Sequence, residues 1–363
     1  MNYDNYLLYI LGAVDGYPIK TKKHLQKLFI NNNVAQRNSQ ISFETIGEEC
    51  LDITEVALTD YVKGTLENNV KAVNIFEKWE FEKDYKYSVL FLCDDFSKKY
   101  DELAAIIDNQ HLSNESEITT ETFDNPVVYQ INNQLILKFN MVFSAFDPLN
   151  QNELLVKYPF LVVFFKELSI VELRFDAIKR VFLSEKNEQN VYSDLISEIR
   201  KLLRTKYNIH LTPFDLDYMT NLANSNITEA IVTAEYKKLP NGGNAQLEVG
   251  NNEKFILPII GDLKVIIEKY KNDLAKVPSL ADALNQFIFE NDELSDYTWL
   301  EVMWPNEVKT RSIRVKFIFN YKGEQYTLMQ HYYNALIGMG RMNYVAERIS
   351  QYKKSFQDTN ENG

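Results

Sequence analysis

The period of the hydrophobic pattern changes near residue 85, and this change restricts the fold more than any other feature of the sequence. Between Tyr3 and Val14 the apolar residues recur with the spacing of an amphipathic helix. Asp15-Gly16-Tyr17-Pro18 ends this helix, and helical spacing returns at Thr21–Ile30 and Thr54–Phe76. The first 80 residues are therefore predicted to be mainly helical.

From Tyr85 onward, short segments rich in aromatic and β-branched residues predict strands. These segments are Tyr85–Cys93, Val127–Ile131, Gln134–Phe146, Tyr158–Lys166 and Leu168–Asp176. In the last of them apolar residues alternate with Glu172, Arg174 and Asp176. We therefore expect an antiparallel strand with one face in water.

Helix and strand signals are mixed in the rest of the chain. Helices are predicted at 190–206, 214–223, 263–274 and 343–356, and strands at 228–239, 245–249, 297–304, 308–321 and 325–332. Pro240-Asn241-Gly242-Gly243 is typical of a hairpin turn. Because the elements lack a βαβ rhythm, the predicted class is α+β: a helical N-terminal region followed by mixed, largely antiparallel sheets with packed helices.

The length of 363 residues exceeds what one hydrophobic core usually spans, which indicates more than one domain. The pattern changes place boundaries near residues 80 and 255. The predicted parts are 1–80, a mainly helical N-terminal domain; 81–254, an α+β domain with an antiparallel sheet; 255–356, an α+β domain ending in a β-meander and a helix; and 357–363, a disordered tail.

Composition restricts the class of protein. Hydrophobic residues make up 45% of the chain, as in ordinary globular proteins. The only cysteines are Cys50 and Cys93, which favours a reducing cytoplasm. The longest apolar run, Tyr158–Phe165, is too short for a membrane span, so no membrane insertion is expected. The N-terminal residues also lack the positive charges of a signal peptide.

No motif for a catalytic site, a metal or a cofactor is present. The histidines His24, His111, His210 and His331 are scattered, and neither cysteine stands near them at the spacing of metal ligands. Serine-hydrolase elbows, phosphate loops and zinc-protease motifs are all missing from the sequence. We therefore predict no cofactor and no metal, and a non-enzymatic role is favoured over a catalytic one.

One segment nevertheless has a catalytic interpretation. Glu235-Tyr236-Lys237 follows an apolar strand, with Asp215 and Asp217 upstream, and it loosely resembles the metal-dependent nuclease pattern. In that pattern an acid and an E-x-K strand hold Mg²⁺ and place a lysine beside the attacked phosphate. The alternative is an ordinary salt bridge at the end of a strand. The nuclease interpretation requires Asp215 or Asp217 to converge on Glu235 and Lys237.

The charge distribution carries the strongest functional signal. The chain has a net charge of −12, yet Gly16–Phe43, Ile199–Phe214 and Val308–Gly323 contain basic residues and no acid. Clustered lysine and arginine dominate the affinity of proteins for nucleic acid. The candidate nucleic-acid contacts are Lys20, Lys22, Lys23, Lys27, Arg200, Lys201, Arg204, Arg311, Arg314 and Lys316.

Each basic segment also has a plainer interpretation. The helix, the Gly16 turn and the basic helix at Thr21–Ile30 could form a helix-turn-helix, or a helical bundle whose basic face is solvated or docks on an acidic partner. The Arg200–Lys206 cluster could be the solvent face of its helix. Arg314 and Lys316 could lie on a solvated strand face that the acids of 292–301 balance.

These observations favour a cytoplasmic, non-enzymatic protein that binds nucleic acid, DNA rather than RNA, as one subunit of a larger assembly. The first alternative is a scaffold or adaptor that binds a protein partner or forms a homo-oligomer without nucleic acid. The second is a Mg²⁺-dependent nuclease. The abundance of Asn, Lys, Ile, Tyr and Phe is typical of AT-rich bacterial or phage genomes, which suggests a role in antiphage defence.

Overall fold

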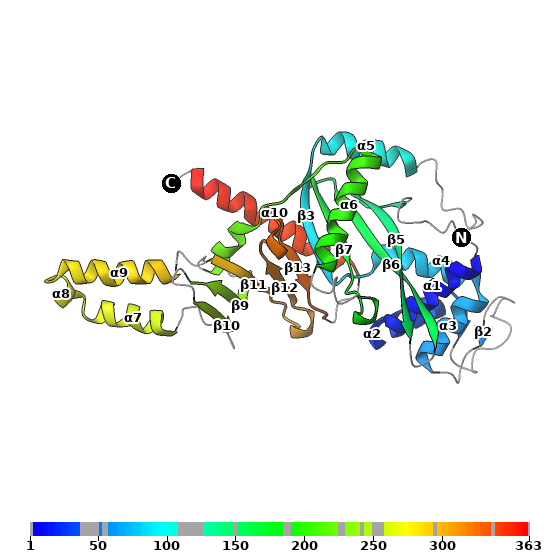
Figure 1. The fold of residues 1–363 in the computed structure, drawn as a ribbon, viewed down its shortest axis with the longest axis horizontal. Helices are drawn as coiled ribbons and strands as arrows, with labels where there is room; N and C mark the ends of the chain where they lie inside the picture. The colour runs from blue at the N-terminus through cyan, green and yellow to red at the C-terminus, as the bar shows by residue number, and fades with distance from the viewer. Residues whose placement is uncertain are drawn as a thin grey trace. The chain divides into compact units, whose positions relative to one another are not determined.

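The structure is a computed structural model, and the chain folds as the predicted α+β class, with helices first and mostly antiparallel strands after them (Figure 1). Unit 1 comprises Met1–Tyr85 and Phe91–Thr212, and unit 2 comprises Lys86–Leu90 and Pro213–Gly363. The predicted boundaries near 80 and 255 stay predictions. The structure describes residues 3–36, 51–52, 57–107, 126–147, 151–183, 190–223, 229–239, 243–248, 258–292, 296–334 and 338–361.

Unit 1 begins with a bundle of four helices around an apolar core. The helices are α1 (Tyr3–Gly16), α2 (Ile19–Asn31), α3 (Leu58–Asn68) and α4 (Val70–Glu82), and a short parallel pair, β1 (Ala35–Gln36) and β2 (Leu51–Asp52), accompanies them. The predicted helix over 54–76 is two helices. Asn69 is extended and its side chain accepts a hydrogen bond from the Lys71 amide, so it begins α4 as an N-cap.

The sheet of unit 1 is an antiparallel meander. Its strands are β4 (Val127–Ile131), β5 (Gln134–Asp147), β6 (Asn152–Phe165) and β7 (Ile170–Phe175), hydrogen-bonded in the order β7-β6-β5-β4. Asn132 has a positive φ of 53°, which suits the tight turn between β4 and β5. The unit also contains α5 (Phe96–Ile107), η2 (Arg180–Phe182), α6 (Val191–Tyr207) and β8 (Leu211–Pro213), whose last residue belongs to unit 2.

Both faces of this sheet are covered. Tyr207 of α6 contacts Phe139 of β5 on one face, while α1 packs on β6 and Lys138 of β5 reaches α4 on the other. The prediction that β7 has one face in water is therefore wrong. Glu172 and Arg174 are buried, and Arg174 donates two hydrogen bonds to Glu172, at 2.9 and 2.6 Å. The N-terminal helices occupy the face that the alternation alone assigned to solvent.

The strands of unit 2 are also antiparallel. They are β9 (Ile231–Lys238), β10 (Asn244–Glu248), β11 (Asp296–Trp304), β12 (Ile313–Ile318) and β13 (Leu328–His331), in the order β10-β9-β11-β12-β13. The first half of β3 (Tyr87–Cys93) pairs with β13. β9 and β10 pair as the hairpin signal predicted, while the turn residues 240–242 lie outside the described residues.

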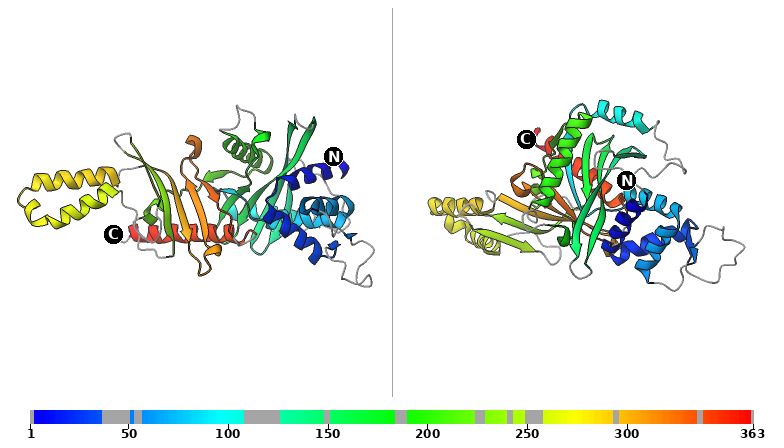
Figure 2. Two further views of the ribbon diagram at one scale, coloured as in Figure 1. Left: turned by 90° about the horizontal axis from the view of Figure 1, so that it is seen from below. Right: turned by 45° about the vertical axis from the view of Figure 1, so that its right-hand side comes forward.

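The last helix, α10 (Gly340–Glu361), lies along one face of these strands (Figure 2). Trp304 of β11 donates a hydrogen bond to the Tyr352 hydroxyl at 3.1 Å, and Tyr218 of η3 (Asp217–Ala223) donates one to the Ile349 carbonyl at 2.8 Å. Part of the predicted disordered tail is helical, because α10 continues to Glu361. No glycine or proline interrupts the chain between Gly340 and that residue.

A helical hairpin is inserted between β10 and β11. It consists of α7 (Pro258–Lys269), α8 (Lys271–Leu274) and α9 (Pro278–Asp292), and α7 and α9 lie side by side in both figures (Figures 1 and 2). The short helices η4 (Lys309–Arg311) and η5 (Tyr321–Gly323) flank β12. Within the described ranges, no helix has the length and apolar character that crossing a membrane requires.

Candidate nucleic-acid interface

The alternation in β12 divides its side chains between two faces of the sheet of unit 2. Val315 and Phe317 are buried in the core, whereas Arg314 is exposed and Lys316 is partly exposed. Successive side chains of a strand point to opposite faces, so the two cations lie on the face opposite the core. The strand thus packs one face in the core and presents its cations on the other.

The strand register places aromatic and polar side chains beside these cations. Lys316 lies opposite Glu301 of β11 and Gln330 of β13, and Gln330 lies opposite Tyr87 of β3. Tyr236 of β9 pairs with Trp299 of β11. We call this surface of unit 2 the aromatic face, and it consists of Tyr87, Tyr236, Trp299, Glu301, Arg314, Lys316, Gln330 and Tyr332.

Two rings form the centre of the aromatic face. The rings of Tyr236 and Trp299 are nearly parallel, with their centroids 6.2 Å apart and an interplanar angle of 9°. The Lys316 ammonium lies 3.6 Å from the centroid of the Trp299 ring. Burial lowers the pKa of Lys316, although Glu301 and Glu248 oppose this shift. The indole is thus a flat surface that already holds a partly desolvated cation.

Glu301 organises the polar part of the aromatic face. Its Oε1 accepts a hydrogen bond from Thr233 at 2.7 Å and lies 3.4 Å from the Arg314 guanidinium, which in turn lies over the Tyr332 ring. Burial, together with a hydrogen bond to Glu301 and its charge, raises the pKa of Tyr332 to about 12. Glu301 therefore positions Arg314, whose side chain remains 48% exposed and accessible to a ligand.

The predicted basic helix presents three of its four lysines to solvent. Lys20, Lys23 and Lys27 of α2 are exposed, and their spacing places them on one face of the helix. Lys22 is buried and donates a hydrogen bond to the Thr59 hydroxyl at 2.9 Å. The Lys22 ammonium thus holds α2 against α3, and the predicted contact of Lys22 with nucleic acid stays a prediction.

The other predicted cations are dispersed. Arg200 of α6 donates a hydrogen bond to the Leu211 carbonyl at 3.0 Å and covers the Phe91 ring, so it has a structural role in unit 1. Lys201 and Arg204 are exposed on the same helix, in agreement with a solvated helix face. Arg311 is exposed in η4, ahead of β12.

The nuclease interpretation gains no support from the structure. Glu235 and Lys237 are buried and form an ion pair of 3.3 Å, as the salt-bridge alternative predicted. Asp215 and Asp217 are exposed, and the Asp215 carboxylate accepts a hydrogen bond from the Asp217 amide at the start of η3. Among the residues that the structure describes, no three acids, histidines or cysteines converge as metal ligands.

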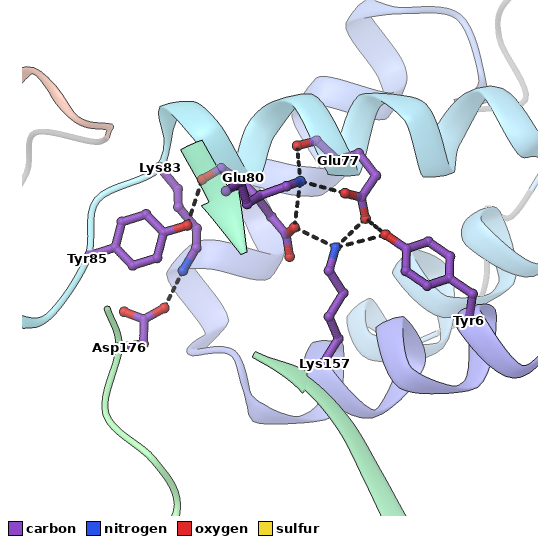
Figure 3. A network of polar contacts seen from close by, with 8 residues as sticks. Tyr6, Glu77, Glu80, Lys83, Tyr85, Lys157 and Asp176 are labelled. Carbon is purple, nitrogen blue, oxygen red and sulfur yellow. Dashed lines mark hydrogen bonds and ion pairs between the residues drawn. The ribbon is translucent and has the colours of Figure 1, made fainter. Parts of the chain in front are cut away.

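Unit 1 contains a buried ionic cluster that sequence patterns did not reveal (Figure 3). Glu77 and Glu80 of α4 meet Lys138 of β5 and Lys157 of β6, and the Tyr6 hydroxyl of α1 joins them. Glu80 accepts from Lys138 at 3.1 Å and from Lys157 at 2.6 Å. The two positive and two negative charges balance, so each buried charge has a partner of the opposite sign and the four side chains link α4, β5 and β6.

The ionic cluster predicts acid sensitivity of unit 1. Burial acts to raise the pKa of Glu77, but Lys138 and Lys157 outweigh it and lower this pKa to about 2. A carboxyl whose pKa is lower in the folded protein stabilises it above the unfolded pKa, and this stability is lost as the pH falls towards the folded pKa. We expect unit 1 to lose about 2 to 3 kcal/mol between about pH 4.5 and about pH 2.

Urea unfolding, monitored by the hydrogen exchange of backbone amides in β5 and β6, would measure this loss of stability. The Glu77→Gln variant provides the comparison, because it lacks the titrating carboxyl. Its stability should change much less over the same pH range. Equal acid sensitivity of the two proteins would show that other groups are responsible.

Neither the models of protein families nor the curated proteins gave a match to this sequence.

Proposed function

We propose that unit 2 binds single-stranded nucleic acid on the aromatic face. The observation that carries the proposal is the Tyr236–Trp299 ring pair, which shares one sheet face with Arg314 and Lys316. Proteins that bind single strands combine aromatic rings, on which unpaired bases stack, with cations that contact the backbone. Both kinds of group are present here at neighbouring positions of the strand register.

The two kinds of group have different roles in this proposal. Unpaired bases stack on Trp299 and Tyr236, which contributes about 1 to 3 kcal/mol per base. The Lys316 ammonium, which covers Trp299 in the free protein, moves to a phosphate when a base takes its place. Arg314, held by Glu301, contacts a second phosphate through its exposed edge. Because the bases of a duplex are already stacked, a single strand should bind more tightly than a duplex.

The cations of the aromatic face set the expected salt dependence. Lys86, whose ammonium lies 5.0 Å from the centroid of the Tyr332 ring, adds a third cation to Arg314 and Lys316. Each phosphate contact to a single strand contributes a slope of about −0.7 to the logarithmic dependence of affinity on salt. Three contacts predict affinity about 20-fold weaker at about 200 mM than at about 50 mM salt.

Fluorescence anisotropy of labelled oligonucleotides with the full chain tests this proposal. The labelled ligands are single-stranded DNA, single-stranded RNA and duplex DNA. Both DNA and RNA are included because stacking and phosphate contacts alone do not distinguish deoxyribose from ribose. We expect both single strands to bind more tightly than the duplex, with the salt dependence given above. No binding of any of the three at low salt would refute the proposal.

Two matched variants assign the binding to a surface. Arg314→Gln/Lys316→Gln removes two positive charges from the aromatic face and should weaken binding of the single strand at least tenfold. Lys23→Gln/Lys27→Gln removes two exposed charges from α2 and should leave the affinity within about twofold, since it changes only long-range electrostatics. If the α2 variant alone loses binding, the interface is the basic helix of unit 1.

A cytoplasmic location and membership of a larger assembly belong to the same proposal. A chain with only two cysteines suits a reducing compartment. Of these two, Cys93 lies within the described residues, and it is a free thiol. Burial, with Asp94 beside it, raises the pKa of the Cys93 thiol to about 11, so this thiol is protonated at neutral pH. An unreactive thiol is consistent with a non-enzymatic binding protein.

A further inference from the structure

The aromatic face extends beyond the Tyr236–Trp299 ring pair, across β12 and β13 to the first half of β3. Lys316 of β12 lies opposite Gln330 of β13, and Gln330 lies opposite Tyr87 of β3. Side chains at directly opposite positions of paired strands lie on the same face. Tyr87 therefore shares a face with Lys316 and stands at the far end of this row from the Tyr236–Trp299 pair.

The neighbour of Tyr87 in the chain confirms this orientation. Ser88 is buried, and its hydroxyl is hydrogen-bonded to His331 Nε2 at 2.8 Å, where His331 lies opposite the core residue Val315. Because successive side chains of a strand alternate between faces, Ser88 lies on the core face and Tyr87 on the aromatic face. There Tyr87 is only partly buried, as Trp299 is.

The cations of the aromatic face lie between these two aromatic positions. β12, which carries Arg314 and Lys316, is paired with β11 on one side and with β13 on the other, and β13 is paired with β3. Tyr332 stands diagonally to Tyr87 across these strands, and Arg314 and Lys86 lie 4.4 and 5.0 Å from the centroid of its ring. Cations that can contact phosphates are therefore close to Tyr87 as well as to Trp299.

The strand order sets the distance between the two aromatic positions. The order β11-β12-β13-β3 contains three steps of about 4.8 Å, which places Trp299 and Tyr87 about 14 Å apart or slightly more. Bases that stay stacked along one strand are about 3.4 Å apart, so about five nucleotides cover this distance, and an extended strand needs fewer. Binding sites for single strands start at about four nucleotides, which agrees with this spacing.

We propose that Tyr87 is a second stacking position, so that one single strand contacts Trp299 with one base and Tyr87 with another. The phosphates between these bases pass over Lys316 and Arg314. The second position rests on the proposed binding of single strands to the aromatic face, and it adds the path and the minimal length of the ligand. A dinucleotide reaches only one of the two positions, whereas a strand of about five nucleotides reaches both.

Competition with a labelled ten-nucleotide oligothymidylate tests the second position in the full chain. Unlabelled oligothymidylates of two, four, six and ten nucleotides displace the label, and fluorescence anisotropy reports the displacement. The affinity should rise at least about tenfold between two and six nucleotides, because the longer strand gains a stacked base and phosphate contacts. From six to ten nucleotides it should change less than about fivefold, since both positions are already filled.

Variants at Tyr87 assign the length dependence to its ring. Tyr87→Val removes the ring and keeps a residue that favours strands. It should weaken binding of the hexamer at least about fivefold, the lower end for one stacked base, and leave the dinucleotide within about twofold. Tyr87→Phe keeps the ring and should bind both as the unchanged chain does.

Tyr270→Leu is the matched control, because it removes another partly exposed ring from unit 2. Tyr270 is 48% exposed and lies between α7 and α8, at the end of the helical hairpin that points away from the strands (Figure 1). This variant should bind every length as the unchanged chain does. A loss of hexamer affinity as large as that of Tyr87→Val would contradict the second position.

Other outcomes would also overturn the second position. If Tyr87→Val binds the hexamer as well as the wild type does, Tyr87 holds no base, while binding at Trp299 is untouched. An equal loss for the dinucleotide and the hexamer would contradict it as well, because a second position affects only strands that are long enough to reach it. A wild-type chain that binds none of the lengths would refute the proposed function together with the second position.

Discussion

Replacing Lys138 by methionine is expected to destabilise unit 1 by about 3 to 5 kcal/mol, the usual effect of removing one partner from a buried ion pair. Lys138 is fully buried and contacts both Glu77 and Glu80. Without it, two carboxylates share the single charge of Lys157, and one of them must stay unpaired or take up a proton. Urea unfolding, read from hydrogen exchange of β5 and β6, measures the loss.

A second substitution separates charge balance from packing. Glu80→Gln in the Lys138→Met background leaves Glu77 opposite Lys157, so the remaining charges cancel again. The double variant should therefore be at least about 2 kcal/mol more stable than the sum of the two single effects predicts. Additive effects would mean that the cluster stabilises unit 1 through packing rather than through its charge balance.

The second large effect is expected at Gly12, where α1 approaches β6. A Cβ at this position would overlap the Leu155 carbonyl, which belongs to the backbone of β6 and cannot rotate away. Gly12→Ala must therefore separate the helix from the sheet, and the neighbouring buried residues Ile10 and Val14 would lose contacts. We expect a loss of about 3 kcal/mol, at the upper end of overpacking substitutions.

Gly16→Ala is the matched control, since it adds the same methyl group to the same helix. There the new Cβ would meet only the end of the flexible Lys179 side chain, 3.2 Å away at Cε. Its effect on the free energy of unfolding should stay within about 1 kcal/mol, because the better helix propensity of alanine offsets part of the loss. Similar losses in both variants would show that glycine is needed in α1 for another reason.

Local patterns were sufficient to predict most of the secondary structure. The hairpin of β9 and β10 and the strand that carries Arg314 and Lys316 are each determined by neighbours in the sequence, and both are confirmed. Helix α9 was missed, although Pro278 begins it and Ala281, Leu284 and Ile288 have helical spacing. Because this helix is partly exposed, polar residues interrupt its apolar pattern, and the helical signal in the sequence is weak.

The sites depend on contacts between distant parts of the chain, which local patterns do not contain. Lys138 was part of a predicted strand, but the positions of Glu77 and Lys157 relative to it follow from tertiary packing. The pairing of Tyr236 with Trp299 likewise joins strands that the helical hairpin separates in sequence. The basic residues of β12 were predicted, whereas the rings beside them were not.

The most direct test of the aromatic face is the fluorescence of Trp299 during titration with a single-stranded oligonucleotide. Trp79 and Trp304 are buried, so Trp299 is the tryptophan that a base can reach. We predict that the oligonucleotide quenches the emission of the wild-type chain over the concentrations that raise its anisotropy. In Trp299→Phe the anisotropy should still rise while the quenching disappears. Equal quenching in both proteins, or binding without quenching in the wild type, would contradict the account.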